Sequence, residues 1–312
     1  MIFICFFKSK KLAKKGSIGI PAGNWKRSGK RQFDEQPPEK GAAGRTKDVP
    51  GRDIESMSAK FHIHSSDPEL LEAATRVAHD FAQRNIRKGV VGIVVLGAVA
   101  RGYFDRSADI DIALFKEQAS DLSFPAKFQE IDGFEVQVWS SDYEHELTVP
   151  WDMPKRWTYS QGQIYYDPLD KISRLLEEKV PLKPPERKWL MMSGLTLSEW
   201  YINRLTQTWV ERGSLASAHH MFYQGLNYFF DMLFGLNDQL VPDMKWRYYC
   251  AEQLERLPSE FRERTEDTMI LRSTSLEELE RRKNTFMAMW AEMRPTVEKE
   301  VGMTFDEMLR VV

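Results

Sequence analysis

The sequence is poor in cysteine, with only Cys5 and Cys250 among its 312 residues. This scarcity excludes a disulfide framework, and no group of cysteine and histidine residues has the spacing of a zinc site. Long apolar runs are also absent. The longest, Val90 to Ala100, contains two glycines and falls well short of the roughly 18 apolar residues that a membrane-spanning helix needs. We therefore expect a cytoplasmic protein that does not cross a membrane.

Charge is unevenly distributed along the chain, although the net charge is only −2. Residues 1–56 contain 13 Lys/Arg and 6 Asp/Glu, whereas the remaining residues contain 31 and 40. The first segment is rich in glycine and proline and lacks helical or strand periodicity, so we predict a disordered basic extension over residues 1–57. It has three interpretations: a nonfunctional extension from an upstream start codon, a basic tail for nucleic acid or anionic lipid, or a targeting segment. The coherent pattern that begins at Met57 favours the first.

One helical pattern followed by three strand patterns predicts an α/β (α+β) domain with a mixed sheet over residues 58–182. The helix is expected to run from Asp67, a capping residue followed by proline, to about Arg87. The first strand is apolar throughout, and the other two alternate apolar and polar residues. These strands are expected at residues 90–96, 109–115 and 134–139.

The proline-rich segment 180–185 is a stiff joint, and we place the domain boundary there. Residues 183–312 are predicted to form an all-α helical bundle domain, because the strand signal vanishes beyond the joint. Helices are expected at residues 188–212, 214–235, 243–256 and 275–300. Apolar residues at helical spacing in the second of these are typical of a bundle core: Phe222, Leu226, Phe229, Phe230, Leu233 and Phe234.

Two carboxylates stand two residues apart on the second predicted strand. Asp109 and Asp111 therefore project to one face, while Ile110 and Ile112 enter the core. Such a pair repels itself and is stabilised by a divalent cation. Oxygen ligands of this kind suit Mg²⁺, which completes its coordination with water and substrate phosphates.

A glycine-containing turn precedes the carboxylate pair and lies near it if the two strands pair. Gly97 lets the backbone approach a ligand and point N–H groups at an anion. Arg101 adds a positive charge able to fork onto a phosphate. The turn, the arginine and the carboxylates together indicate a site for a nucleoside triphosphate.

The order of these features carries a resemblance to a known family. A strand, the segment Gly-Ala-Val-Ala-Arg-Gly from Gly97 to Gly102, six residues and Asp-Ile-Asp-Ile together resemble the signature of the nucleotidyltransferase superfamily of the DNA polymerase β type. The sequence is most similar to the short bacterial nucleotidyltransferase-domain proteins, a group that includes aminoglycoside and lincosamide nucleotidyltransferases. The resemblance covers residues 68–172 and extends loosely over the helical remainder.

The resemblance implies an enzyme that moves a nucleoside monophosphate from an NTP, expected to be ATP, to a hydroxyl of a small-molecule or protein acceptor and releases pyrophosphate. In this interpretation Asp109 and Asp111 hold Mg²⁺. The nucleotide is bound by the turn residues Gly97, Ala98, Arg101 and Gly102. The acidic folded part favours a cationic acceptor over nucleic acid, which only the basic tail would attract.

The resemblance also implies a third carboxylate on the following strand, where this sequence has Gln137. Glutamine offers a neutral oxygen but no charge and no proton-accepting capacity. Glu135 lies on the same face two residues earlier, about 6 to 7 Å away along the strand. Two functions therefore stay open: an active transferase in which Gln137 or Glu135 serves, and a weak or silent nucleotide-binding or regulatory protein.

Transferases of this kind often take their general base from the helical domain, and three candidates stand there. Asp231 is the most informative, because a carboxylate within an aromatic face must be hydrogen-bonded or functional. Glu199 is the second candidate. His219 and His220 are the third, and adjacent helical histidines cannot face the same site, so we expect one in the core and one on the surface.

Two further patterns carry weaker indications. His62 and His64 have same-face spacing but lack a third metal ligand. The segment from Lys245 to Tyr249 mixes basic and aromatic residues, and we expect its aromatics to pack rather than to stack on a base.

Overall fold

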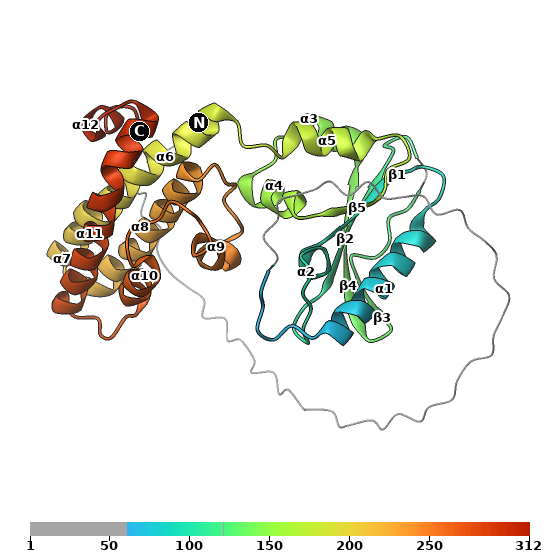
Figure 1. Cartoon of the computed structure of the whole chain (residues 1–312), viewed down its shortest axis with the longest axis horizontal. Helices are drawn as coiled ribbons and strands as arrows, with labels where there is room; N and C mark the ends of the chain where they lie inside the picture. Colours follow the sequence, from blue (N-terminus) through green and yellow to red (C-terminus); the bar gives the residue numbers. More distant parts are fainter. Residues whose placement is uncertain (1–60, 121) are drawn as a thin grey trace, which may run out of the picture. The chain divides into compact units, whose positions relative to one another are not determined.

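The computed structural model describes residues 61–120 and 122–312 (Figure 1). The predicted basic extension over residues 1–57 lies outside this part of the chain. Within it, no helix is long and apolar enough to cross a membrane. The described residues form a mixed sheet followed by a run of helices, which agrees with the predicted α/β class.

Five strands of the described chain form one sheet, in the order β3-β4-β2-β1-β5. Their bounds are β1 Val90–Leu96, β2 Ile110–Lys116, β3 Phe128–Ile131, β4 Phe134–Asp142 and β5 Gln163–Tyr166. Strand β2 pairs with β4 in parallel, and the other neighbouring pairs are antiparallel. The three predicted strands are confirmed as β1, β2 and β4, whereas the short strands β3 and β5 at the two edges are additions.

The β3–β4 hairpin owes its tight connection to Asp132 and Gly133. Both residues have positive φ, 50° and 80° respectively. Two successive left-handed residues form the turn whose twist matches that of the strands it joins, and Asp-Gly is a preferred pair for it. This turn holds β3 against β4 at the edge of the sheet.

Helices cover the sheet on both faces. The helix α1, Pro68–Asn85, is capped by the Asp67 side chain and ends two residues before the predicted Arg87. Its apolar stripe packs into one cluster with Ile110 and Ile112 of β2. On the other face, α4 (Met153–Ser160) and α5 (Lys171–Lys179) contribute to a separate core. The short helices α2, Gly97–Ala100, and α3, Tyr143–Thr148, follow β1 and β4.

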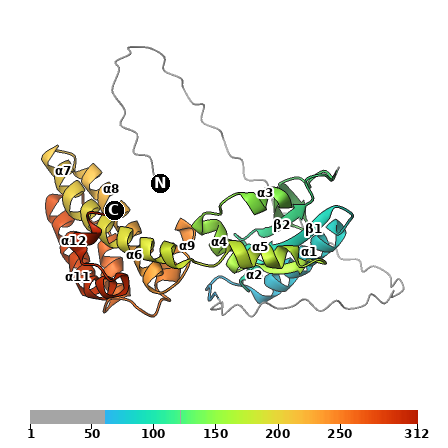
Figure 2. The ribbon, with the colours of Figure 1, turned by 90° about the horizontal axis from the view of Figure 1, so that it is seen from above.

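The remaining helices lie together in one group (Figure 2). Their buried apolar side chains form one large core. These helices are α6 Pro184–Glu199, the π-helical turn η1 Trp200–Leu205, α7 Thr206–Glu211, α8 Leu215–Leu236, α9 Met244–Ala251, α10 Phe261–Met269, α11 Leu276–Val301 and α12 Phe305–Met308. All six predicted core residues of α8 are buried. The predicted helix over 188–212 corresponds to α6, η1 and α7 in succession, and the predicted helix over 243–256 ends earlier, at Ala251.

Helix α9 packs its aromatic side chains against the sheet part of the chain. The Trp246 ring lies 5.4 Å from the Phe61 ring and 5.8 Å from the Tyr103 ring, centroid to centroid. The Tyr249 hydroxyl accepts a hydrogen bond from the backbone N–H of His62 at 3.0 Å. The expectation that these aromatics pack is confirmed, and their packing brings α9 to the glycine turn that ends in Gly102.

Candidate functional site

The two predicted carboxylates stand at the start of β2 and turn away from the core. Ile110 and Ile112 are fully buried on the α1 side, as the alternation predicts. Asp111 lies within the strand and Asp109 directly precedes it. Both are partly exposed, so they are accessible to a ligand.

Gln137 joins the two carboxylates from the neighbouring strand β4. It is the register partner of Asp111 in the parallel β2–β4 pair. With its amide nitrogen turned toward them, Gln137 donates to Asp109 Oδ2 at 3.3 Å and to Asp111 Oδ1 at 3.2 Å. Glu135 lies two residues earlier, opposite Glu130 of β3, and lines a hollow on the hairpin instead. The structure thus gathers Asp109, Asp111 and Gln137, and Glu135 lies on the same face of β4 two residues before Gln137.

The glycine turn lies directly against the Asp111 carboxylate. Gly97 has φ +62°, and a Cβ at this position would stand 2.1 Å from Asp111 Oδ2. Its neighbour Ala98 is buried, whereas Gly102, with φ +77°, is exposed and has open space around it. Only glycine at 97 therefore permits this approach, which the sequence pattern anticipated from the pairing of the strands.

Electrostatics single out Asp111. Burial raises the pKa of its carboxyl, and the charge of Asp109 adds to the increase. A hydrogen bond of 3.0 Å from Trp139 Nε1 to Asp111 Oδ1 opposes the shift, as do the charges of Lys245 and Arg101. A carboxyl under these opposing influences gains from a nearby cation, because a cation removes the cost of ionisation.

The oxygen atoms of this site suit a single hard cation. Asp109 and Asp111 supply two carboxylates, and rotation of the Gln137 amide from its donating orientation would present its oxygen as a neutral third ligand. Such donors match Mg²⁺, which keeps water and phosphate ligands at its other positions. No group of three His, Cys, Asp or Glu side chains able to hold a metal ion occurs in the described chain. His62 and His64 are both exposed, and they belong to no such group among the described residues.

Arg101 lies in an aromatic enclosure and does not extend into solvent. Its guanidinium carbon is 4.4 Å from the Trp157 ring centroid, 5.2 Å from that of Trp246 and 5.4 Å from that of Phe61. The side chain is 7% exposed, and burial lowers its pKa. Among described residues its Nε has no hydrogen-bond partner. Arg101 thus anchors α9 beside the turn, and its charge reaches Asp111 through space.

The three general-base candidates differ in environment. Asp231 is largely buried, and burial raises the pKa of its carboxyl to about 6, while Arg247 of α9, at 3.2 Å, opposes the shift. Glu199 precedes the π-helical turn and accepts a hydrogen bond from Asn203. His219 is buried and His220 is exposed, as expected of the pair.

Two contributors to this site were not recognised in the sequence. Trp139 follows Gln137 by two residues, so strand alternation predicts that the two side chains lie on one face. The alternation does not predict the hydrogen bond from Trp139 to Asp111. The charge of Lys245 acts on Asp111 from 134 residues away along the chain, and no local pattern reveals such a long-range influence.

Comparison with known proteins leaves the family open. No protein-family model matches the sequence, and no curated protein matches it. Among solved structures, a nucleotidyltransferase-like protein from Exiguobacterium sibiricum 255-15 is similar, with a TM-score of 0.43 and 10% identity over 74% of this chain and 78% of that one. A likeness of this size assigns neither a family nor an activity, so the function must rest on the chain's own residues.

Proposed function

We propose that this protein is a Mg²⁺-dependent nucleotidyltransferase. It transfers a nucleoside monophosphate from an NTP, expected to be ATP, to a hydroxyl of a small-molecule or protein acceptor and releases pyrophosphate. The observation that supports this most is the convergence of Asp109, Asp111 and Gln137 in front of Gly97, where a side chain at position 97 would close the space.

Asp109 and Asp111 would hold the Mg²⁺ ion, and the Gln137 amide oxygen would be a third, neutral ligand. When bound, the ion would offset phosphate charge and stabilise the charge that develops during attack on the α-phosphorus. Gln137 adds no negative charge, so we expect weaker metal binding than three carboxylates would give.

The backbone of the glycine turn would position the phosphates. Gly97 and Ala98 open the turn, and amides at such a turn are donors to anions. The enclosed Arg101 would act by its charge and by holding α9 in place, not by forking onto a phosphate as first expected. Positioning of this kind accounts for much of the acceleration in transfer reactions.

Asp231 is the candidate that best suits proton removal from the acceptor hydroxyl. A carboxyl with a pKa of about 6 is mostly ionised at pH 7 and still accepts a proton readily. It pairs with Arg247, which stands two residues after Lys245 on α9. Since α9 also contacts Arg101 through Trp246, this helix links Asp231 to the carboxylate pair.

Label transfer tests the proposal. The full chain is incubated with Mg²⁺, ATP labelled at the α-phosphate and a panel of hydroxyl-bearing acceptors. We expect label in the acceptor and stoichiometric pyrophosphate, and a loss of about a hundredfold or more in Asp109→Ala because the metal site loses a charged ligand. Asp80→Ala, an exposed carboxylate of α1, is the matched control and should retain the rate.

A second candidate function is nucleotide binding without turnover. The amide of Gln137 and the indole of Trp139 satisfy Asp109 and Asp111 with neutral donors, which stabilises the pair without metal. Measurable ATP binding with neither label transfer nor pyrophosphate would refute the transferase and favour this alternative.

A further inference from the structure

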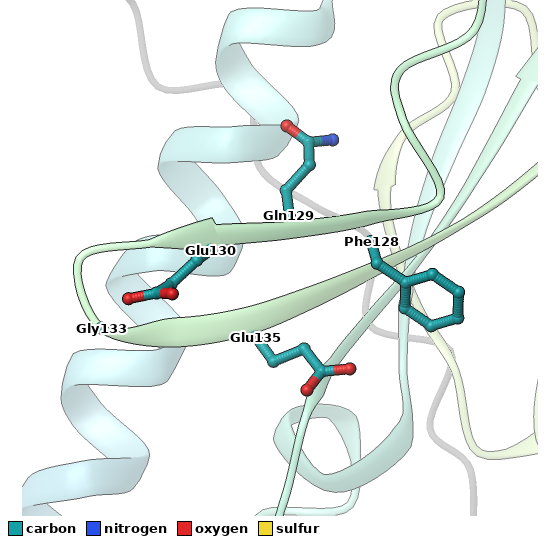
Figure 3. A pocket seen from close by; sticks show the side chains of 5 residues that line it. All are labelled: Phe128, Gln129, Glu130, Gly133 and Glu135. Carbon is teal, nitrogen blue, oxygen red and sulfur yellow. The ribbon is translucent and has the colours of Figure 1, made fainter. Parts of the chain in front are cut away.

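The β3–β4 hairpin carries a surface beside the proposed metal and nucleotide site. A hollow of ≈ 380 Å³ lies on it, lined by Phe128, Gln129, Glu130, Gly133 and Glu135. Figure 3 shows that Phe128, Glu130 and Glu135 point to one side of the hairpin and Gln129 to the other. The strand register agrees, since Glu130 faces Glu135 and Phe128 faces Gln137.

Two carboxylates of this surface are direct cross-strand neighbours. Glu130 and Glu135 are opposite each other and exposed, and like charges in this position destabilise a strand pair. Within residues 61–120 and 122–312, neither forms an ion pair with a basic side chain. A cation bound between them would remove this repulsion.

Two aromatic rings continue the surface and already hold an ammonium group. Phe128 is 56% exposed and Trp139 is 46% exposed, both high for large apolar side chains. The Lys127 ammonium lies 5.3 Å from the Phe128 ring centroid and 4.8 Å from that of Trp139. Because the Lys127 ammonium lies over these two rings, a cationic group of a ligand can occupy the same position.

The surface is continuous with the candidate active site. Trp139 donates to Asp111, and Phe128 stands opposite Gln137, whose amide touches both carboxylates. A ligand over these rings therefore lies next to Asp111.

We propose that this surface binds an organic dication of the polyamine type. One ammonium group lies between Glu130 and Glu135, and the other replaces the Lys127 ammonium over the Phe128 and Trp139 rings. A hydroxyl-bearing dication bound there would be the acceptor of the transfer, and only this role rests on the proposed function.

Calorimetric titration of the full chain with spermidine, without nucleotide or metal, tests the site. We expect one binding event that weakens as salt is added, and no binding of triethylene glycol, a neutral chain. Glu130→Gln with Glu135→Gln should lower the affinity about tenfold, and Trp139→Leu about three- to fivefold. Glu263→Gln, an exposed carboxylate of α10, is the matched control and should bind as the wild type does.

Lys127→Ala gives the sharpest distinction. Removal of the internal ammonium should raise spermidine affinity several-fold, because the ligand no longer competes with it. Affinity that is unchanged in the double glutamine variant, or reduced in Lys127→Ala, overturns the site. If spermidine binds but no hydroxyl-bearing dication receives the label, the binding site stands and its role as an acceptor site is refuted. If the protein is not a transferase at all, the result of the titration is unaffected.

Discussion

Alanine at position 97 should disrupt the contact between the glycine turn and the carboxylate pair. A Cβ there meets Asp111 Oδ2 at 2.1 Å, and φ of +62° is costly for any residue with a side chain. We expect about 1 kcal/mol of backbone strain and a further ~1 to 3 kcal/mol from the clash. Gly97→Ala should therefore lower the free energy of unfolding by roughly 2 to 4 kcal/mol.

Gly213→Ala is the matched control for backbone strain. Gly213 has φ +75°, and a Cβ added to it would meet nothing within 4 Å, so only the strain of about 1 kcal/mol applies. Urea denaturation of both variants separates the clash from the strain. The loss of unfolding free energy in Gly97→Ala minus that in Gly213→Ala is the contribution of the clash with Asp111.

A double-mutant cycle identifies the partner in the clash. Because the closest atom belongs to the Asp111 carboxylate, Gly97→Ala in an Asp111→Ala background should cost little more than the strain. An equal cost of Gly97→Ala in both backgrounds would refute the placement of the turn against Asp111.

Three other predictions concern stability and pH. Burial raises the pKa of Asp231 to about 6 in the folded state, so its contribution to stability is present below the unfolded pKa and is lost as pH rises through 6. Relative to Asp231→Asn, the wild type should lose about 2 kcal/mol of stability between pH 4 and pH 8 in denaturation curves, and a pH-independent difference would contradict this. Burial and the Arg282 charge lower the pKa of His219, so stability should fall as pH drops below about 6.5, and His219→Gln should remove this slope in thermal melts. Trp246→Ala should cost about 2 to 3 kcal/mol and increase hydrogen exchange in α9 and the turn, whereas exchange confined to α9 would show that Arg101 does not couple the two.

The sheet around the site was predictable where the pattern is local. Alternation on β2 and β4 placed Asp109, Asp111 and Gln137 on one face, and the structure confirms that they meet. The short strand β3 was missed because it has only four residues. The pair Asp132-Gly133 between two extended segments was the signal that indicates a hairpin there.

The environment of Arg101 was not predictable in the same way. Its enclosing rings come from Trp157 and Trp246, which lie 56 and 145 residues further along the chain. A basic residue after a glycine turn has the same local pattern whether it meets a phosphate or an aromatic cage. Packing against residues distant in the sequence decides between these two environments. The local pattern therefore predicted a phosphate contact for Arg101 and not its burial among aromatic rings.

Pyrophosphate release by Gln137→Glu tests the central claim most directly. This substitution adds a third carboxylate beside Asp109 and Asp111, so Mg²⁺-dependent release from ATP should rise about tenfold or more over the wild type and saturate at lower Mg²⁺. The wild type should be slower but active, and Asp109→Ala inactive. A Gln137→Glu rate equal to or below that of the wild type, with the same Mg²⁺ dependence, would contradict a metal site built on these three residues.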